Sequence, residues 1–194
     1  WISPSQQRER SGRAQRLNAG QGAALAESPK VDARIGVLKV GPFVEDLQRS
    51  EQQRYDARKA YALALQQRIV DLDDGTRCAW MVDVSSNGGG NMWPMLLGLL
   101  PLLQGTPDAQ GALIGAFRSA DGLQWWRQGE GEVRQDGTQG LRSRQAAYHL
   151  RAGRAPVAVL MGARTASSGE AVALAFRGQA GSRSFGQPSA GFST

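Results

Sequence analysis

Apolar residues along the chain gather into short runs, separated by longer segments in which apolar and polar positions recur at helical spacing. The runs 34–40, 78–84 and 156–161 have the length of strands, and the unbroken run 78–84 is typical of a strand buried on both faces. From about 44 to 70 the apolar positions fall on one face of a predicted helix, namely Tyr55, Ala62, Leu65 and Ile69.

Two more helices and a short strand follow these elements. One helix opens near Asn91, because asparagine is a favoured N-cap, and another runs from about 167 to 177. The strand lies near 183–186. Strands that alternate with helices along a chain predict an α/β fold with a largely parallel sheet.

The remaining segments are less regular. The runs 112–118 and 123–128 favour a hairpin around Asp121-Gly122, and the polar, glycine-rich segment 129–145 favours a loop. Residues 1–33 show no sustained period, which predicts an N-terminal loop or cap segment that is partly disordered. The chain is therefore expected to consist of this segment and a core at 34–194.

Composition narrows the function classes. The formal net charge of +6 makes nucleic-acid binding a function to consider. The arginines are mostly scattered, however, and no RNA-binding or zinc-finger motif is present. We therefore predict a solvated basic surface and no nucleic-acid partner. The longest apolar run, 92–103, is shorter than the roughly 20 residues that a membrane-spanning helix needs.

A single cysteine and a single histidine limit the metal and redox chemistry. Cys78 cannot form an intramolecular disulfide, and its apolar neighbours predict that it is buried. One histidine, His149, excludes a histidine-rich metal site within the chain. No cofactor or metal is expected.

Two junctions between a strand and a helix carry candidate chemistry. At 83–90 a triple glycine follows a strand and lets backbone N–H groups approach a ligand; a phosphate-binding loop would need a lysine after the glycines, and none is present. At 162–170 Ser167 stands at a predicted helix start, where the helix dipole and free N–H groups stabilise a developing oxyanion. The alternative for Ser167 is helix capping alone, with Glu170 completing a capping box.

Both junctions lie at carboxyl ends of predicted parallel strands, where ligands bind in open α/β sheets. One junction offers bare backbone donors and the other offers a hydroxyl. This is the layout of an oxyanion hole beside a serine nucleophile.

The chain resembles the C-terminal-processing, or tail-specific, serine proteases in four segments that stand in the family's order. They are Ile35-Gly36-Val37-Leu38-Lys39-Val40, the loop 83–90, the stretch 156–160 with Thr165-Ala166-Ser167-Ser168-Gly169-Glu170, and Gly186-Gln187-Pro188-Ser189-Ala190-Gly191. The resemblance implies a crotonase-like (ClpP/crotonase-type) core. The chain is expected to be a fragment, truncated at both ends. The resemblance also implies a serine endopeptidase that cleaves peptides or unstructured protein tails through an acyl-enzyme, in the bacterial periplasm or cell envelope.

The same resemblance assigns roles to individual residues. Ser167 matches the nucleophile, and Glu170 matches a supporting carboxylate. The backbone N–H groups of Ser168 and Gly89 match the oxyanion-hole donors, with near alternatives at Gly88 and Gly90.

The general base departs from the pattern of the Ser–Lys branch, because Phe192 stands at the lysine position. The Ser-Gly-Glu ending is closer to the branch with nisin-resistance, tricorn-like and retinoid-binding-protein-like members, several of which use an upstream histidine. His149 precedes a strand that Ser167 follows, so we expect the sheet to separate the two; Lys39, inside its strand, is equally disfavoured. The base is expected outside this chain.

Two other functions remain open at this level. The first is a non-catalytic ligand-binding module of the same fold, with an apolar pocket near Trp93, Trp125 and Trp126. The second is a crotonase-type acyl-thioester enzyme, which would use backbone oxyanion donors but would not need the serine at 167.

Overall fold

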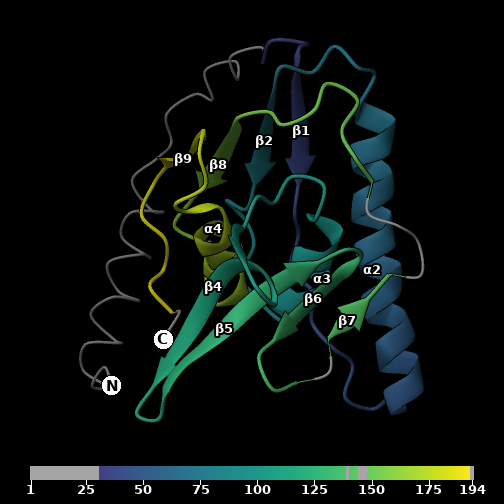
Figure 1. Ribbon diagram of the computed structural model, residues 1–194, viewed down its shortest axis with the longest axis vertical. Helices are drawn as coiled ribbons and strands as arrows, with labels where there is room; N and C mark the ends of the chain where they lie inside the picture. The colour runs from purple at the N-terminus through teal and green to yellow at the C-terminus, as the bar shows by residue number, and fades with distance from the viewer. Residues whose placement is uncertain (1–30, 139, 144–147, 193–194) are drawn as a thin grey trace, which may run out of the picture. The chain divides into compact units, whose positions relative to one another are not determined.

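The computed structural model describes residues 31–138, 140–143 and 148–192, and within them two β-sheets enclose a helical layer (Figure 1). Ala33–Thr194 forms one compact unit. The predicted segment 1–33 lies almost wholly outside the described residues. Within the described ranges no helix combines the length and the apolar character needed to cross a membrane.

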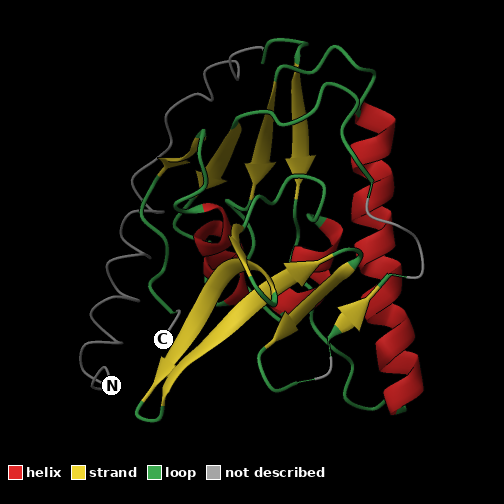
Figure 2. Cartoon of the chain, in the orientation of Figure 1, coloured by secondary structure: helices red, strands yellow, loops and turns green. Residues whose placement is uncertain are grey.

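The first sheet is parallel and has four strands. They are β1 (Ile35–Lys39), β2 (Ala79–Asp83), β8 (Val157–Met161) and β9 (Ser182–Gly186), in the order β1-β2-β8-β9. The strands point the same way, so their carboxyl ends meet at one edge (Figure 2). The predicted α/β fold with a parallel sheet is confirmed.

The described ranges hold three helices: α2 (Glu51–Leu72), α3 (Met92–Gly98) and α4 (Ser168–Phe176). α2 contacts β1, α4 contacts β8 and β9, and α3 packs against both of these helices. α2 begins later than its apolar pattern suggested because Ser50 caps it. The Ser50 hydroxyl accepts a hydrogen bond from the Gln53 N–H at 3.3 Å, and the Gln53 side chain accepts one from the Ser50 N–H at 3.0 Å. Residues 44–50 are thereby left as a loop that reaches the candidate site.

The second sheet is antiparallel and only partly expected. It runs in chain order through β3 (Thr106–Asp108), β4 (Gly111–Ser119), β5 (Gly122–Gly129), β6 (Glu132–Gln135) and β7 (Leu141–Arg142). The hairpin of β4 and β5 was predicted, but the loop predicted at 129–145 was wrong in part, since it contains β6 and β7. These strands are short and polar because they cover an edge of the sheet, and only Val133 and Leu141 are buried.

The hydrophobic core lies between the sheets and includes Trp80, Ile69, Leu97, Trp126 and Phe176. Cys78 does not join it. The residue is exposed, since it lies before the first residue of β2, in which Trp80 and Val82 are buried. The prediction of a buried cysteine was therefore wrong.

Candidate active site

Three strand ends converge at the carboxyl edge of the parallel sheet. β1 leads into 40–43, β2 into the glycine loop (residues 84–90), and β8 into the serine turn (residues 162–167) that opens α4. The loop and the turn are joined directly, because the Ala166 N–H donates to the Asn87 carbonyl at 3.0 Å. The sheet therefore brings together the two junctions that the sequence singled out.

Asn87 is the centre of these contacts and is fully buried. Its side-chain amide donates to the carbonyls of Val40 and Gly41, both at 3.2 Å. Its side-chain oxygen accepts the Gly89 N–H at 2.9 Å. One side chain thus fixes the glycine loop to the end of β1 and sets the turn within the loop.

Thr165 holds the other side of the junction and is also fully buried. Its hydroxyl donates to the Val84 carbonyl at 2.8 Å and accepts the Gly162 N–H at 2.9 Å. Sequence reasoning assigned no role to Asn87 or Thr165. The only available signal was the presence of a small polar residue within each candidate segment.

Ser167 is the N-cap of α4 and has φ 49° and ψ −119°. No other non-glycine residue in the described ranges has a positive φ. Such a conformation costs about 1–3 kcal/mol and persists only where the surroundings impose it. The residue is exposed, although Ser168, Gly169 and Glu170 after it are buried.

Glu170 imposes part of that conformation. Glu170 is only 5% exposed. One of its carboxylate oxygens accepts a hydrogen bond from the Ser167 N–H at 2.9 Å. The other oxygen accepts the Gly191 N–H at 2.8 Å. Glu170 therefore connects the serine turn with the segment after β9, and a carboxylate in the first turn also suits the helix dipole.

Gly89 lies directly against the candidate nucleophile. An added Cβ there would stand 2.9 Å from the Ser167 Cβ and 3.3 Å from its Oγ, and the φ of Gly89 is +113°. Only glycine fits this close approach without strain. The Gly89 N–H, however, already donates to Asn87, so as an oxyanion donor it would be shared between two acceptors.

Ser168 and Gly90 make a second link across the site. The Ser168 hydroxyl donates to the Gly90 carbonyl, whereas the Ser168 backbone N–H has no acceptor among the described residues. A free first-turn N–H beside an exposed hydroxyl can stabilise a developing negative charge. Gly88 is exposed and has open space around its Cα.

The candidate bases do not gather here. His149 is exposed, and Arg151 two residues later donates its backbone N–H to Asp73 at 2.7 Å, just beyond the C-terminal end of α2. β8 then runs between this region and the serine turn. Lys39 is exposed on the edge strand β1, and no described histidine or lysine forms a hydrogen bond with the Ser167 hydroxyl.

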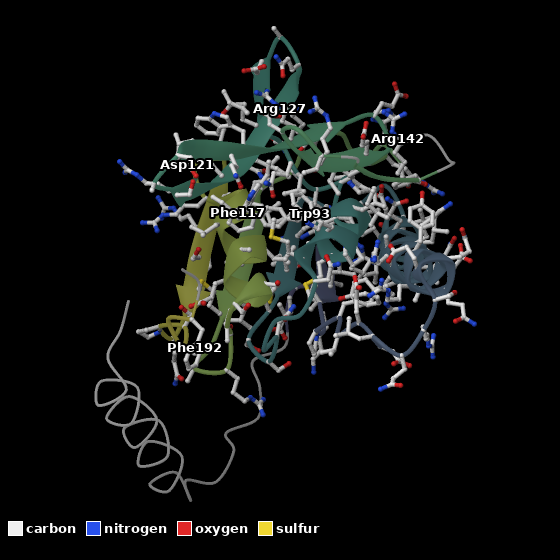
Figure 3. All side chains as sticks on the ribbon, turned by 90° about the horizontal axis from the view of Figure 1, so that it is seen from below. Trp93, Phe117, Asp121, Arg127, Arg142 and Phe192 are labelled. Atoms are coloured by element: carbon white, nitrogen blue, oxygen red, sulfur yellow. The ribbon has the colours of Figure 1, made fainter. Side chains whose placement is uncertain are left out.

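The segment after β9 returns to the site. The Ala190 N–H donates to the Thr165 carbonyl at 2.8 Å, next to the bond between Gly191 and Glu170. Phe192 follows and is 56% exposed, on the side of the molecule away from the β4–β5 hairpin (Figure 3). An apolar side chain thus stands where the Ser–Lys branch has its lysine.

An apolar recess of about 480 Å³ adjoins Ser168 and Gly90. Its other walls come from the 44–50 loop, α3 and β4, and it is lined by Val44, Glu45, Leu47, Asn91, Met92, Trp93 and Phe117. The three tryptophans do not line it together. Trp126 is buried and contacts Trp93 edge-to-face with ring centroids 6.4 Å apart, while Trp125 lies on the other face of β5.

Hydrogen bonds hold the loop wall of this recess and the residues that lead into it from β1. Glu45 accepts hydrogen bonds from Arg58 at 2.7 Å and from the Asn91 side chain, and the Arg58 hydrogen bond, more than any other contact, lowers the pKa of Glu45. Tyr61 donates its hydroxyl to the Gly41 carbonyl at 2.6 Å, and burial raises its pKa to about 12. The loop is therefore anchored on both α2 and α3.

Known proteins share parts of this chain. The nisin-resistance protein of Lactococcus lactis subsp. lactis is 34% identical over 114 residues, which cover 59% of this chain and 33% of that protein. The structure of a lipoprotein from Streptococcus agalactiae matches with a TM-score of 0.58 and 19% identity, over 92% of this chain and 54% of that one. The second likeness shows a shared fold. The chain spans about a third to a half of the length of these relatives.

The family assignment rests on the whole core. The sequence profile of Peptidase family S41 matches residues 34–194, which include both junctions and every residue of the candidate site. The resemblance seen in the four segments is confirmed, as is the distant similarity to a nisin-resistance protein. The chain belongs to Peptidase family S41.

Proposed function

We propose that this chain carries the catalytic core of a serine endopeptidase that cleaves peptides or unstructured protein tails. The observation that carries the proposal is the serine turn: Ser167 is exposed at a helix start, in a backbone conformation of positive φ, in contact with Gly89. A serine needed only for capping would not require this conformation. Membership of a peptidase family supports a protein substrate.

In the proposed reaction the Ser167 Oγ bonds to the carbonyl carbon of the scissile peptide, and its proton passes to a general base. The Ser168 N–H and an N–H of the glycine loop hold the resulting oxyanion. The C–N bond then breaks, and the base returns the proton to the leaving amine. Water hydrolyses the acyl-enzyme by the same route and frees Ser167.

Within the glycine loop we keep Gly89 as the proposed oxyanion donor, with Gly88 and Gly90 as its alternatives. Gly89 is favoured because a Cβ built there would meet Ser167, whereas one at Gly88 would meet nothing within 4 Å and one at Gly90 would meet Phe43 instead. Asn87 then acts as a second acceptor that orients the N–H before substrate arrives. We propose a histidine on the N-terminal side of Trp1 in the protein as the general base.

The finer fold and the location follow from the same proposal. A parallel sheet whose strand ends supply backbone donors suits a crotonase-like core. An extracytoplasmic site of action, in the periplasm or cell envelope, is supported by the likeness to a streptococcal lipoprotein.

The test is covalent labelling of the full-length protein with a fluorophosphonate probe, followed by mapping of the labelled residue. We expect labelling at Ser167 and its loss in Ser167→Ala, together with loss of β-casein cleavage. A protein that never labels but binds apolar ligands would be the binding module instead. Hydrolysis of acyl-thioesters that survives in Ser167→Ala would indicate the crotonase-type enzyme.

A further inference from the structure

One half of strand β4 has an open edge. β3 pairs only with residues 111–113 of β4, and the register then shifts between Leu113 and Gly115. From 115 to 119 β4 pairs with β5 on one side, and no described residue pairs with it on the other. Unpaired N–H and C=O groups on such an edge are a template for another strand.

The pairing determines which backbone groups point outward. Ser119 and Gly122 pair across a two-residue turn, so Ser119 and Phe117 face β5 and the intervening residues do not. Ala116 stands opposite Trp125, and the Trp125 carbonyl accepts the Asp136 N–H at 2.9 Å on the far side of β5. The N–H and C=O groups of Ala116 and Arg118 therefore point away from the hairpin.

This edge runs beside the candidate site. Phe117, between the two outward-facing residues, lines the apolar recess together with Ser168 and Gly90. Figure 3 shows Phe117 next to Trp93 beneath the hairpin and Asp121 at its tip. A strand added to β4 would pass the serine turn and the glycine loop.

We propose that the open edge of β4 binds the substrate by β-strand addition. The occupant is an extended peptide segment about five or six residues long, which matches the open stretch 115–119 of β4. Its backbone pairs with Ala116 and Arg118, and alternate side chains turn toward the recess. The inference rests on the proposed function and gives a reason for a preference for unstructured substrates.

The protein itself offers a direct test at residue 116. Proline there removes an outward N–H without breaking a bond to β5, and edge strands tolerate proline at such positions. The matched control is Ala116→Val, which keeps the N–H. For a decapeptide taken from the main β-casein cleavage site, we expect kcat/KM to fall about 10-fold or more in Ala116→Pro and to change less than about twofold in Ala116→Val.

Fluorophosphonate labelling separates this effect from loss of the catalytic site. The small probe does not reach along the edge, so both variants should label Ser167 at the wild-type rate. Unchanged labelling with unchanged peptide cleavage in Ala116→Pro would overturn the inference and leave the proposed function standing. A wild-type protein that neither labels nor cleaves would refute the proposed function itself.

A second measurement decides the matter if Ala116→Pro does not fold. Successive backbone amides of the decapeptide are replaced by esters, each of which removes one N–H. Loss of kcat/KM at every second position supports strand addition, and uniform or absent loss overturns it. A concentration-dependent dimer that disappears in Ala116→Pro while cleavage is retained would assign the edge to a second copy of the chain instead.

Discussion

Replacement of Glu170 tests whether the serine turn is held in a productive conformation. The carboxylate is buried and accepts two backbone N–H groups, from Ser167 at 2.9 Å and from Gly191 at 2.8 Å. Glu170→Gln keeps the size of the side chain but leaves one acceptor oxygen. Its NH2 group would then face one of the two backbone donors.

The expected magnitude follows from the hydrogen bonds. A hydrogen bond to a charged group contributes about 1.5–3 kcal/mol, so Glu170→Gln should lower the free energy of unfolding by about that amount. The positive φ of Ser167 stores about 1–3 kcal/mol, and the turn relaxes when its partner is lost. If the same free energy is lost from the reactive conformation of Ser167, the rate of fluorophosphonate labelling should drop about 10- to 100-fold.

The assay combines urea unfolding, which measures stability, with the labelling rate of the folded protein. Glu130→Gln is the matched control because Glu130 is exposed at a turn, and it should leave both quantities within error. If Glu170→Gln loses stability but labels at the wild-type rate, Glu170 does not position the nucleophile. If neither quantity changes, the carboxylate does not hold the turn at all.

Three more predictions concern the surroundings of the site. Gly89→Val, whose Cβ would press on the nucleophile at a φ of +113°, should cost about 1–3 kcal/mol in urea unfolding and slow labelling at least about 100-fold, whereas Gly88→Ala, with open space, should do neither. His149→Ala should leave β-casein cleavage and its pH–rate profile unchanged; a large fall in turnover together with loss of one limb of that profile would make it the base. Because Arg58 lowers the pKa of Glu45, that contact stabilises the fold above the unfolded value of 4.5 and is lost as the pH falls through the folded pKa. Arg58→Gln should therefore flatten the fall in urea stability as the pH drops below 4.5.

The local pattern carried much of the fold and the chemistry. Continuous apolar runs mark β2 and β8, in which buried positions alternate with half-buried ones, so that neither face carries a run of polar positions. The serine before a helix and the triple glycine after a strand are local features of the backbone, so both candidate motifs could be found without the structure. Their place at the same sheet edge followed from the parallel order alone.

The polar strands and the cysteine escaped prediction for the same reason. β6 and β7 have few apolar residues. β6 forms because β5 offers an edge to pair with, and β7 pairs in turn with β6. Arg127 also forms ion pairs with Asp108 and Asp136 across the sheet. Burial of Cys78 was inferred from its neighbours, whereas the register of β2 leaves it outside the sheet. Whether a polar segment forms a strand, and whether a residue at a strand end is buried, depends on pairing between segments that are distant in the sequence.

Residues at the site divide in the same way. Ser167, Ser168 and Gly89 were candidates from the sequence, because their chemistry depends on a helix start and on a bare backbone. Only the tertiary structure identified Asn87, whose hydrogen bonds join residues 46 and 47 positions apart, and the positive φ of Ser167. Hydrogen bonds that cross such distances leave no periodic trace in the sequence, since their partners become neighbours only when the parallel strands have assembled.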